Sequence, residues 1–96
     1  MLKLYQLPVE TEYYLYSYGE AQNMGFNIND YICVYSTDKN DTKDLEKIFD
    51  AFNLFDVDWV KDAENNHNIR YMAVSDIVEV DGKKYYCDSH GWVSLN

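Results

Sequence analysis

The stretch from Val74 to Leu95, V-S-D-I-V-E-V-D-G-K-K-Y-Y-C-D-S-H-G-W-V-S-L, has the clearest secondary-structure pattern in the chain. Two β-prone runs flank the dipeptide Asp81-Gly82. This dipeptide favours a type I′ hairpin turn, because both central residues of that turn need a positive φ. A further β-prone run begins at Trp92. The stretch therefore predicts a three-stranded β-meander, and we expect the rest of the chain to pack on it.

The composition is that of a globular protein with many aromatic residues. The chain has 96 residues, of which 47% are apolar, and this predicts one domain spanning residues 1–96 rather than a disordered chain. It contains ten tyrosines, four phenylalanines and two tryptophans. Because a tyrosine buries a ring and keeps a polar tip, tyrosines suit both strand faces and interfaces.

The charge balance is strongly acidic. Seventeen acidic residues against eight basic ones give a net charge of −9, which disfavours direct binding to nucleic acid or to anionic membranes. No apolar run approaches the roughly 18 residues of a membrane-spanning helix. The first residues also lack the charged-then-apolar order of a secretory signal. We therefore expect a cytoplasmic protein, and any partner that reads the charge should be basic.

Upstream of the meander the pattern predicts three more strands. Residues 2–7 alternate in polarity and form a first strand, which Pro8 ends because proline cannot donate to a sheet ladder. Residues 13–18 have high β-propensity and predict a second strand. Residues 31–35 are apolar on both faces, which predicts a central strand.

Two helices are expected between these strands. Residues 20–24 suit a short helix that Gly25 stops, and residues 43–54 suit the main helix, capped by Asp41 or Thr42. The main helix has one apolar stripe that predicts a core face, formed by Leu45, Ile48, Phe49 and Phe52. The order of elements predicts an α+β fold with a largely antiparallel sheet of about five to six strands.

The cysteines and histidines do not make a convincing metal site. Cys87 and His90 have the C-x-x-H spacing of half a zinc site, but such a site needs about four ligands, and Cys33 and His67 are isolated in sequence. We therefore expect no metal. The two cysteines are predicted to be buried, reduced thiols, since a disulfide would require their strands to be neighbours.

No catalytic constellation or cofactor motif is present. Asp88, Ser89 and His90 are the residue types of a hydrolase triad, but neighbours on one tight turn cannot align in series. They predict a turn in which Asp88 or Ser89 bonds the backbone. The run from Asp56 resembles a calcium loop but lacks its third ligand and its glycine, so only weak cation binding stays open. No phosphate-binding glycine motif occurs, and we expect no cofactor.

Acidic residues concentrate in the middle of the chain, where residues 38–64 hold nine acids and four lysines. Carboxylates two apart on a strand or four apart on a helix are separated by distances comparable to those between phosphates along a DNA strand. This predicts a surface that mimics DNA, although a solvated face serving only solubility is the alternative. The predicted partner-binding residues are Asp41, Asp44, Glu46, Asp50, Asp56, Asp58, Trp59, Asp62 and Glu64.

The meander also carries a family resemblance. Val74-Ser75-Asp76-Ile77-Val78, then Asp81-Gly82, then Tyr85 to Trp92 resembles the YodL-like domain, and a looser similarity continues upstream at residues 5–7, 45–48 and 52–53. The resemblance implies a protein of conjugative elements, plasmids or phages of Firmicutes, with no established enzymatic activity. The chain departs from the family pattern at residues 56–70, which are rich in Asp and Asn, and at His90, where the family usually has an apolar residue.

These observations lead to a functional hypothesis and an alternative. The hypothesis is a non-enzymatic binding protein of a mobile element, an antidefence factor such as an anti-CRISPR or anti-restriction inhibitor. It would cover the basic nucleic-acid-binding surface of a Cas effector or restriction enzyme. The alternative is an accessory module for transfer or replication proteins, homodimeric through its tyrosine-rich sheet. An enzyme would need the groups around Asp88 to meet in one pocket.

Overall fold

The computed structural model describes residues 1–65 and 68–95, with Asp62, Glu64 and Asn65 described by their backbone alone. These described residues form a five-stranded sheet, two α-helices and two 3-10 helices. The elements in chain order are β1 (Leu2–Gln6), α1 (Tyr18–Asn23), η1 (Ile28–Asp30), β2 (Ile32–Thr37), α2 (Leu45–Leu54), η2 (Asp58–Asn65), β3 (Ile77–Val80), β4 (Lys83–Asp88) and β5 (Gly91–Ser94). The α+β class is confirmed.

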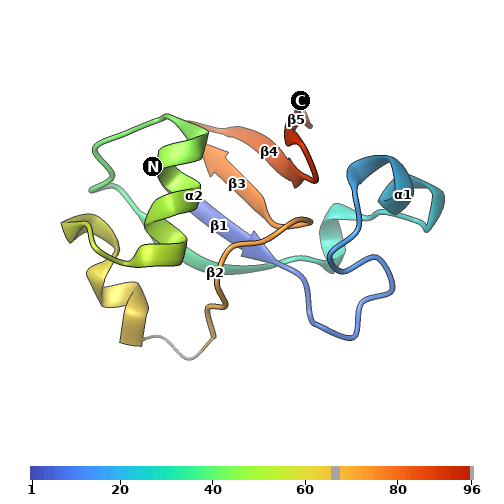
Figure 1. Ribbon diagram of the computed structural model, residues 1–96, viewed down its shortest axis with the longest axis horizontal. Coiled ribbons are helices and arrows are strands. Elements are labelled where there is room, and N and C mark those ends of the chain that lie inside the picture. Colours follow the sequence, from blue (N-terminus) through green and yellow to red (C-terminus); the bar gives the residue numbers. More distant parts are fainter. Residues whose placement is uncertain (66–67, 96) are drawn as a thin grey trace.

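The sheet has the strand order β2-β1-β3-β4-β5, and every neighbouring pair is antiparallel (Figure 1). The predicted meander is confirmed as β3, β4 and β5. Asp81 and Gly82 join β3 to β4 with φ angles of 51° and 84°, as a type I′ turn requires. β1 pairs with both β2 and β3, so the N-terminal strand and the meander form one continuous sheet.

The predicted strand at residues 13–18 is wrong. Residues 13–17 form turns, in which the Tyr16 N–H donates to the Tyr13 carbonyl at 3.1 Å and Leu15 has a φ of 72°, and Tyr18 begins α1. The Tyr13 ring is buried, and its hydroxyl bonds the Asn27 carbonyl and the Asp30 carboxylate, each at 3.0 Å. Tertiary contacts of the tyrosine therefore override its strand propensity.

The third predicted strand exists as β2, but its predicted central position is wrong. β2 lies at the edge of the sheet, next to β1, and β1 and β3 hold the central positions. Val34 and Tyr35 pack against the core, whereas Ile32 is 57% exposed. The apolar run is therefore not buried on both faces. Ile32 near its start is exposed, and a β-bulge opposite Leu4 and Tyr5 interrupts the alternation of its side chains.

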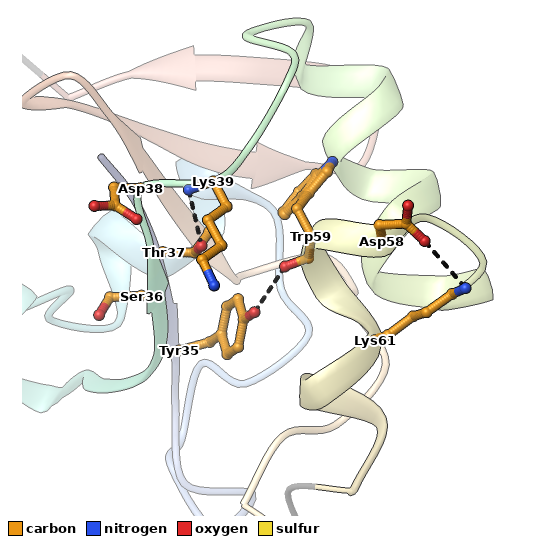
Figure 2. Close-up of a pocket in the computed structure, with 8 residues that line it drawn as sticks. All are labelled: Tyr35, Ser36, Thr37, Asp38, Lys39, Asp58, Trp59 and Lys61. Atoms are coloured by element: carbon orange, nitrogen blue, oxygen red, sulfur yellow. Dashed lines mark hydrogen bonds and ion pairs between the residues drawn. The ribbon is translucent and has the colours of Figure 1, made fainter.

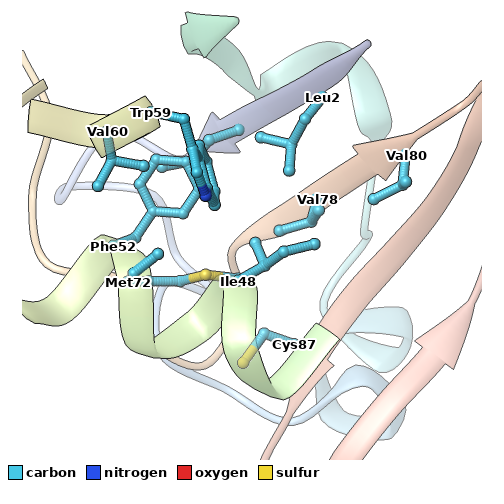
Figure 3. Packing of buried hydrophobic residues seen from close by; sticks show 11 residues of the cluster. Leu2, Ile48, Phe52, Trp59, Val60, Met72, Val78, Val80 and Cys87 are labelled. Carbon is cyan, nitrogen blue, oxygen red and sulfur yellow. The ribbon is translucent and has the colours of Figure 1, made fainter. Parts of the chain in front are cut away.

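Helix α2 lies across one face of the sheet and forms the main core (Figure 3). Ile48 and Phe52 on α2 are fully buried against strand residues that include Leu2 and Val78, which confirms the predicted stripe. The helix begins two residues later than predicted, because Asp44 is its cap. The Asp44 carboxylate accepts from the N–H groups of residues 46 and 47, whereas Asp41 and Thr42 lie before the cap.

A second hydrophobic cluster lies on the opposite face of the sheet, since neighbouring strand residues such as Ile77 and Val78 point to opposite faces. It contains Ile77 and Tyr86 from the sheet and Ala21 from α1. The Phe26 ring contacts four tyrosine rings, those of Tyr13, Tyr18, Tyr31 and Tyr86. Much of the tyrosine content is therefore internal packing.

The two cysteines are not partners. Cys33 is exposed on β2 and Cys87 is buried on β4, and the strands are separated by β1 and β3. The expectation of two buried thiols is therefore confirmed for Cys87 and wrong for Cys33. Both thiols are free.

Candidate functional site

The fold gathers three of the predicted acidic residues around one groove of about 470 Å³. Asp41 comes from the loop before α2, Asp50 from its middle and Asp56 from the segment after it. Phe55 ends α2 in the left-handed conformation, with a φ of 53°, and so turns the following residues back toward the helix. We call this feature the acidic groove, lined by Asp41, Thr42, Lys47, Asp50, Ala51, Leu54, Asp56, Val57 and Trp59.

The acidic groove has an excess of negative charge, because three carboxylates and one ammonium group line it. Asp41, Asp50 and Asp56 are all exposed. Among the residues that the structure describes, none of the three forms an ion pair, and no group of three or more acidic, histidine or cysteine side chains is arranged to hold a metal ion. The three carboxylates are therefore exposed on the surface around the groove.

Three other predicted acids lie outside the acidic groove. Asp44 caps α2, and Glu46 accepts a hydrogen bond from the indole N–H of Trp92 at 2.9 Å. Asp58 is 98% exposed and forms an ion pair with Lys61 at 3.1 Å. It lines a second hollow, between η2 and β2, together with Asp38 and Lys39 (Figure 2).

Two of the predicted acids, Asp62 and Glu64, lie outside the side chains that the structure describes. Of the remaining six acids, three line the acidic groove and three lie elsewhere. The predicted acidic region therefore contributes carboxylates both to the acidic groove and to positions outside it.

Trp59 belongs to the core rather than to an exposed contact surface. Its side chain is 7% exposed, its ring meets Phe52 edge to face at 5.9 Å, and its carbonyl accepts from the Tyr35 hydroxyl at 2.8 Å (Figure 2). The exposed apolar residue of the groove is Leu54, which is 64% exposed. Tyr71 does not line the groove, but it is 70% exposed and its ring lies 5.9 Å from that of Phe55, the residue that follows Leu54.

Sequence reasoning missed the exposure of two apolar side chains, Leu54 and Tyr71. A signal for Leu54 exists, because it lies four residues after Asp50 and therefore on the same, polar face of α2. Tyr71 has no such signal, since it lies in an irregular segment before β3.

The contacts of the turn after β4 give this turn a structural role. The Asp88 carboxylate accepts from the Tyr18 N–H at 3.1 Å and from the Ser89 N–H at 2.9 Å, so it joins the start of α1 to the meander. Gly91 has a φ of 92°, which glycine adopts without strain. Burial raises the pKa of the Cys87 thiol to about 12, so this thiol is a poor nucleophile at neutral pH.

The fold and the groove together define a class of protein. It is a small α+β domain in which an antiparallel sheet carries one long helix on one face and an aromatic cluster on the other, with an acidic groove beside the helix. A family model described as the YodL-like domain matches residues 1–96, and the chain belongs to that family. Comparisons with curated proteins and with solved structures found no match. In the described part of the chain no helix is long and apolar enough to cross a membrane.

Proposed function

We propose that this YodL-like domain is a non-enzymatic binding protein that docks its acidic groove on a basic, nucleic-acid-binding surface of another protein. The observation that carries the proposal is the meeting of Asp41, Asp50 and Asp56, which come from three different segments, around one groove with an exposed leucine. A face that served solubility alone would not require carboxylates from three segments to surround an apolar side chain.

Charge and apolar contact have separate roles in this proposal. The net charge of −9 raises the rate of association with a cationic surface, an effect that salt weakens. Leu54 and Tyr71 supply the apolar contact that slows dissociation, the role that Trp59 cannot fill from the core.

The context implied by the YodL-like resemblance narrows the proposed partner. In a conjugative element, plasmid or phage, a small acidic binding protein would act in the cytoplasm against host defence. The partner would then be a Cas effector or a restriction enzyme, whose DNA-binding channel is basic because it neutralises phosphates. The domain would be an anti-CRISPR or anti-restriction factor that occupies this channel.

Co-expression with a panel of Cas nucleases and restriction enzymes tests the proposal. We expect the wild-type chain to reduce DNA cleavage by at least one enzyme and to co-purify with it at low salt. The double variant Asp50→Asn, Asp56→Asn should weaken this association by about tenfold, since each exposed charge pair contributes up to about 1 kcal/mol.

The matched control changes two exposed carboxylates in the N-terminal loop, Glu10→Gln and Glu12→Gln, and so alters the net charge equally. It should leave association unchanged within about twofold. Unchanged cleavage across the panel, with no co-purifying protein, would contradict the proposal. A stable homodimer in light scattering would instead favour an accessory module of the transfer or replication machinery.

A further inference from the structure

Gln6 and Asp76 form a buried polar cluster with the backbone of the segment before β3. The Asp76 Oδ2 accepts from the Gln6 side-chain amide at 3.0 Å and from the Ala73 N–H at 2.9 Å. The Gln6 side chain also donates to the Arg70 carbonyl and accepts from the Arg70 N–H, each at 3.0 Å. Gln6 is 1% exposed and Asp76 is 2% exposed. Two buried side chains thus attach residues 69–76, the connecting segment, to the end of β1.

The connecting segment joins both hydrophobic clusters. Met72 is 3% exposed in the core beneath α2. Ser75 accepts the Leu15 N–H on its hydroxyl at 3.0 Å and the Tyr31 hydroxyl on its carbonyl at 2.6 Å. Ser75 also has a φ of 85°, a conformation that costs a residue with a side chain free energy. The segment therefore depends on its side-chain contacts to stay in place.

Arg70 is a cation whose charge acts on Asp76, but it does not pair directly with Asp76. Its guanidinium donates to the Leu7 carbonyl and lies over the Tyr14 ring, 5.1 Å from the centroid. Within the described residues, no ion pair joins Arg70 to Asp76. The positive charge therefore offsets only part of the cost of burying an ionised carboxyl group.

The other titratable groups that face Asp76 are neutral near pH 7. Burial raises the pKa of Tyr31 far above its ordinary value and that of Cys87 to about 12. Burial also raises the pKa of Asp76 to about 7, although the hydrogen bonds from Ala73 and Gln6 and the charge of Arg70 act in the opposite direction. Neutral pH is therefore where the charge of Asp76 changes.

We propose that the protonation state of Asp76 controls local opening of the connecting segment. Protonated Asp76 keeps its two accepted hydrogen bonds without a buried charge, so it holds the segment against β1. Ionised Asp76 is more stable in water than in the protein interior. It reaches water when residues 69–76 separate from β1 and Met72 leaves the core. The result is a segment that loosens as pH rises.

The direction in which pH changes the opening follows from proton linkage. The closed segment binds a proton more readily than the open one, in which Asp76 has its ordinary pKa of about 4. The stabilisation of the closed segment is therefore complete below about pH 4 and is lost as pH rises toward 7. Opening should increase between these values and level off above pH 7.

Amide hydrogen exchange on the full chain, read by NMR, tests the proposal. Protection factors, corrected for the intrinsic pH dependence of exchange, are measured at Arg70, Ala73 and Cys87. The N–H groups of the first two belong to the buried polar cluster, and Cys87 donates to the Asp76 carbonyl at 2.8 Å. We expect protection to fall roughly fiftyfold from pH 5 to pH 7, for an Asp76 that becomes fully solvated on opening.

Asp76→Asn is the decisive variant, because the amide oxygen can accept both hydrogen bonds but carries no titratable charge. It should remove the pH dependence at all three amides. Asp88→Asn, a second carboxyl group that accepts two backbone N–H groups, is the matched control and should retain it.

A titration of the wild-type Asp76 carboxyl carbon by NMR keeps the proposal testable if the variant fails to fold. A midpoint near pH 7 supports the proposal. A midpoint below pH 5, or a wild-type protection pattern that does not change with pH, overturns it.

Discussion

Phe52 and Leu54 lie two positions apart on α2 and have opposite surroundings. Phe52 is fully buried, and its ring meets those of Tyr35 and Trp59 edge to face at 5.8 and 5.9 Å. Leu54 is 64% exposed at the acidic groove. At the scale of single residues, one of the two therefore stabilises the fold and the other is available for binding.

Replacing each of these residues by alanine should separate the two roles. Phe52→Ala should lower the free energy of unfolding by about 3–5 kcal/mol, because it removes a ring from a packed core. Leu54→Ala should change it by less than about 0.5 kcal/mol. Urea denaturation followed by circular dichroism measures both values. Equal destabilisation by the two substitutions would contradict the assigned packing.

The cap of α2 gives a second test at this scale. Asp44→Ala should cost about 1 kcal/mol of stability, because it removes the carboxylate that accepts from the first N–H groups of the helix. Asp41→Ala, which changes one of the two residues that the sequence predicts as a cap, should have a much smaller effect. The same denaturation experiment compares them, and a larger loss for Asp41→Ala would show that the helix begins earlier.

At the scale of elements, the β3–β4 hairpin and helix α1 make opposite use of glycine. Gly82 has a φ of 84° in the hairpin turn, whereas Gly19 lies within α1 without a positive φ. An added Cβ would meet no atom within 4 Å at either position. Backbone conformation alone therefore decides the effect of a substitution.

Alanine substitutions at these glycines should have opposite signs. Gly82→Ala should destabilise the protein by about 1–2 kcal/mol, because alanine resists the left-handed conformation. Gly19→Ala should stabilise it by about 0.5–1 kcal/mol, because alanine loses less conformational entropy in a helix. Thermal unfolding monitored by calorimetry measures both changes. Destabilisation by Gly19→Ala would contradict the placement of α1.

Some of these elements could be predicted from the sequence, and others could not. The meander and α2 were predictable because their signals, the Asp81-Gly82 turn and a 3.6-residue apolar repeat, are local. The turns at residues 13–17 were not, since the Tyr13 ring packs beside Phe26 and its hydroxyl bonds Asp30. These contacts depend on chain segments that sequence periodicity does not connect.

At the scale of the whole molecule, the sheet separates two hydrophobic clusters, and the connecting segment is linked to both. The acidic groove lies on the side of the molecule that carries α2. Sequence reasoning identified its carboxylates from charge density, but it could not foresee that Trp59 would be buried or that Asp44 would serve as a cap. Those outcomes depend on where the segments around α2 fold back.

Competition between the domain and DNA for one partner is a direct test of whether the acidic groove covers a DNA-binding surface. Binding of a labelled DNA duplex to a nuclease that the domain captures would be measured at increasing concentrations of the domain. If the acidic groove occupies the DNA-binding surface, the apparent Kd for DNA should rise in proportion to the domain concentration, and the Asp50→Asn, Asp56→Asn variant should shift it much less. A ternary complex, with DNA affinity unchanged at saturating domain, would contradict the account.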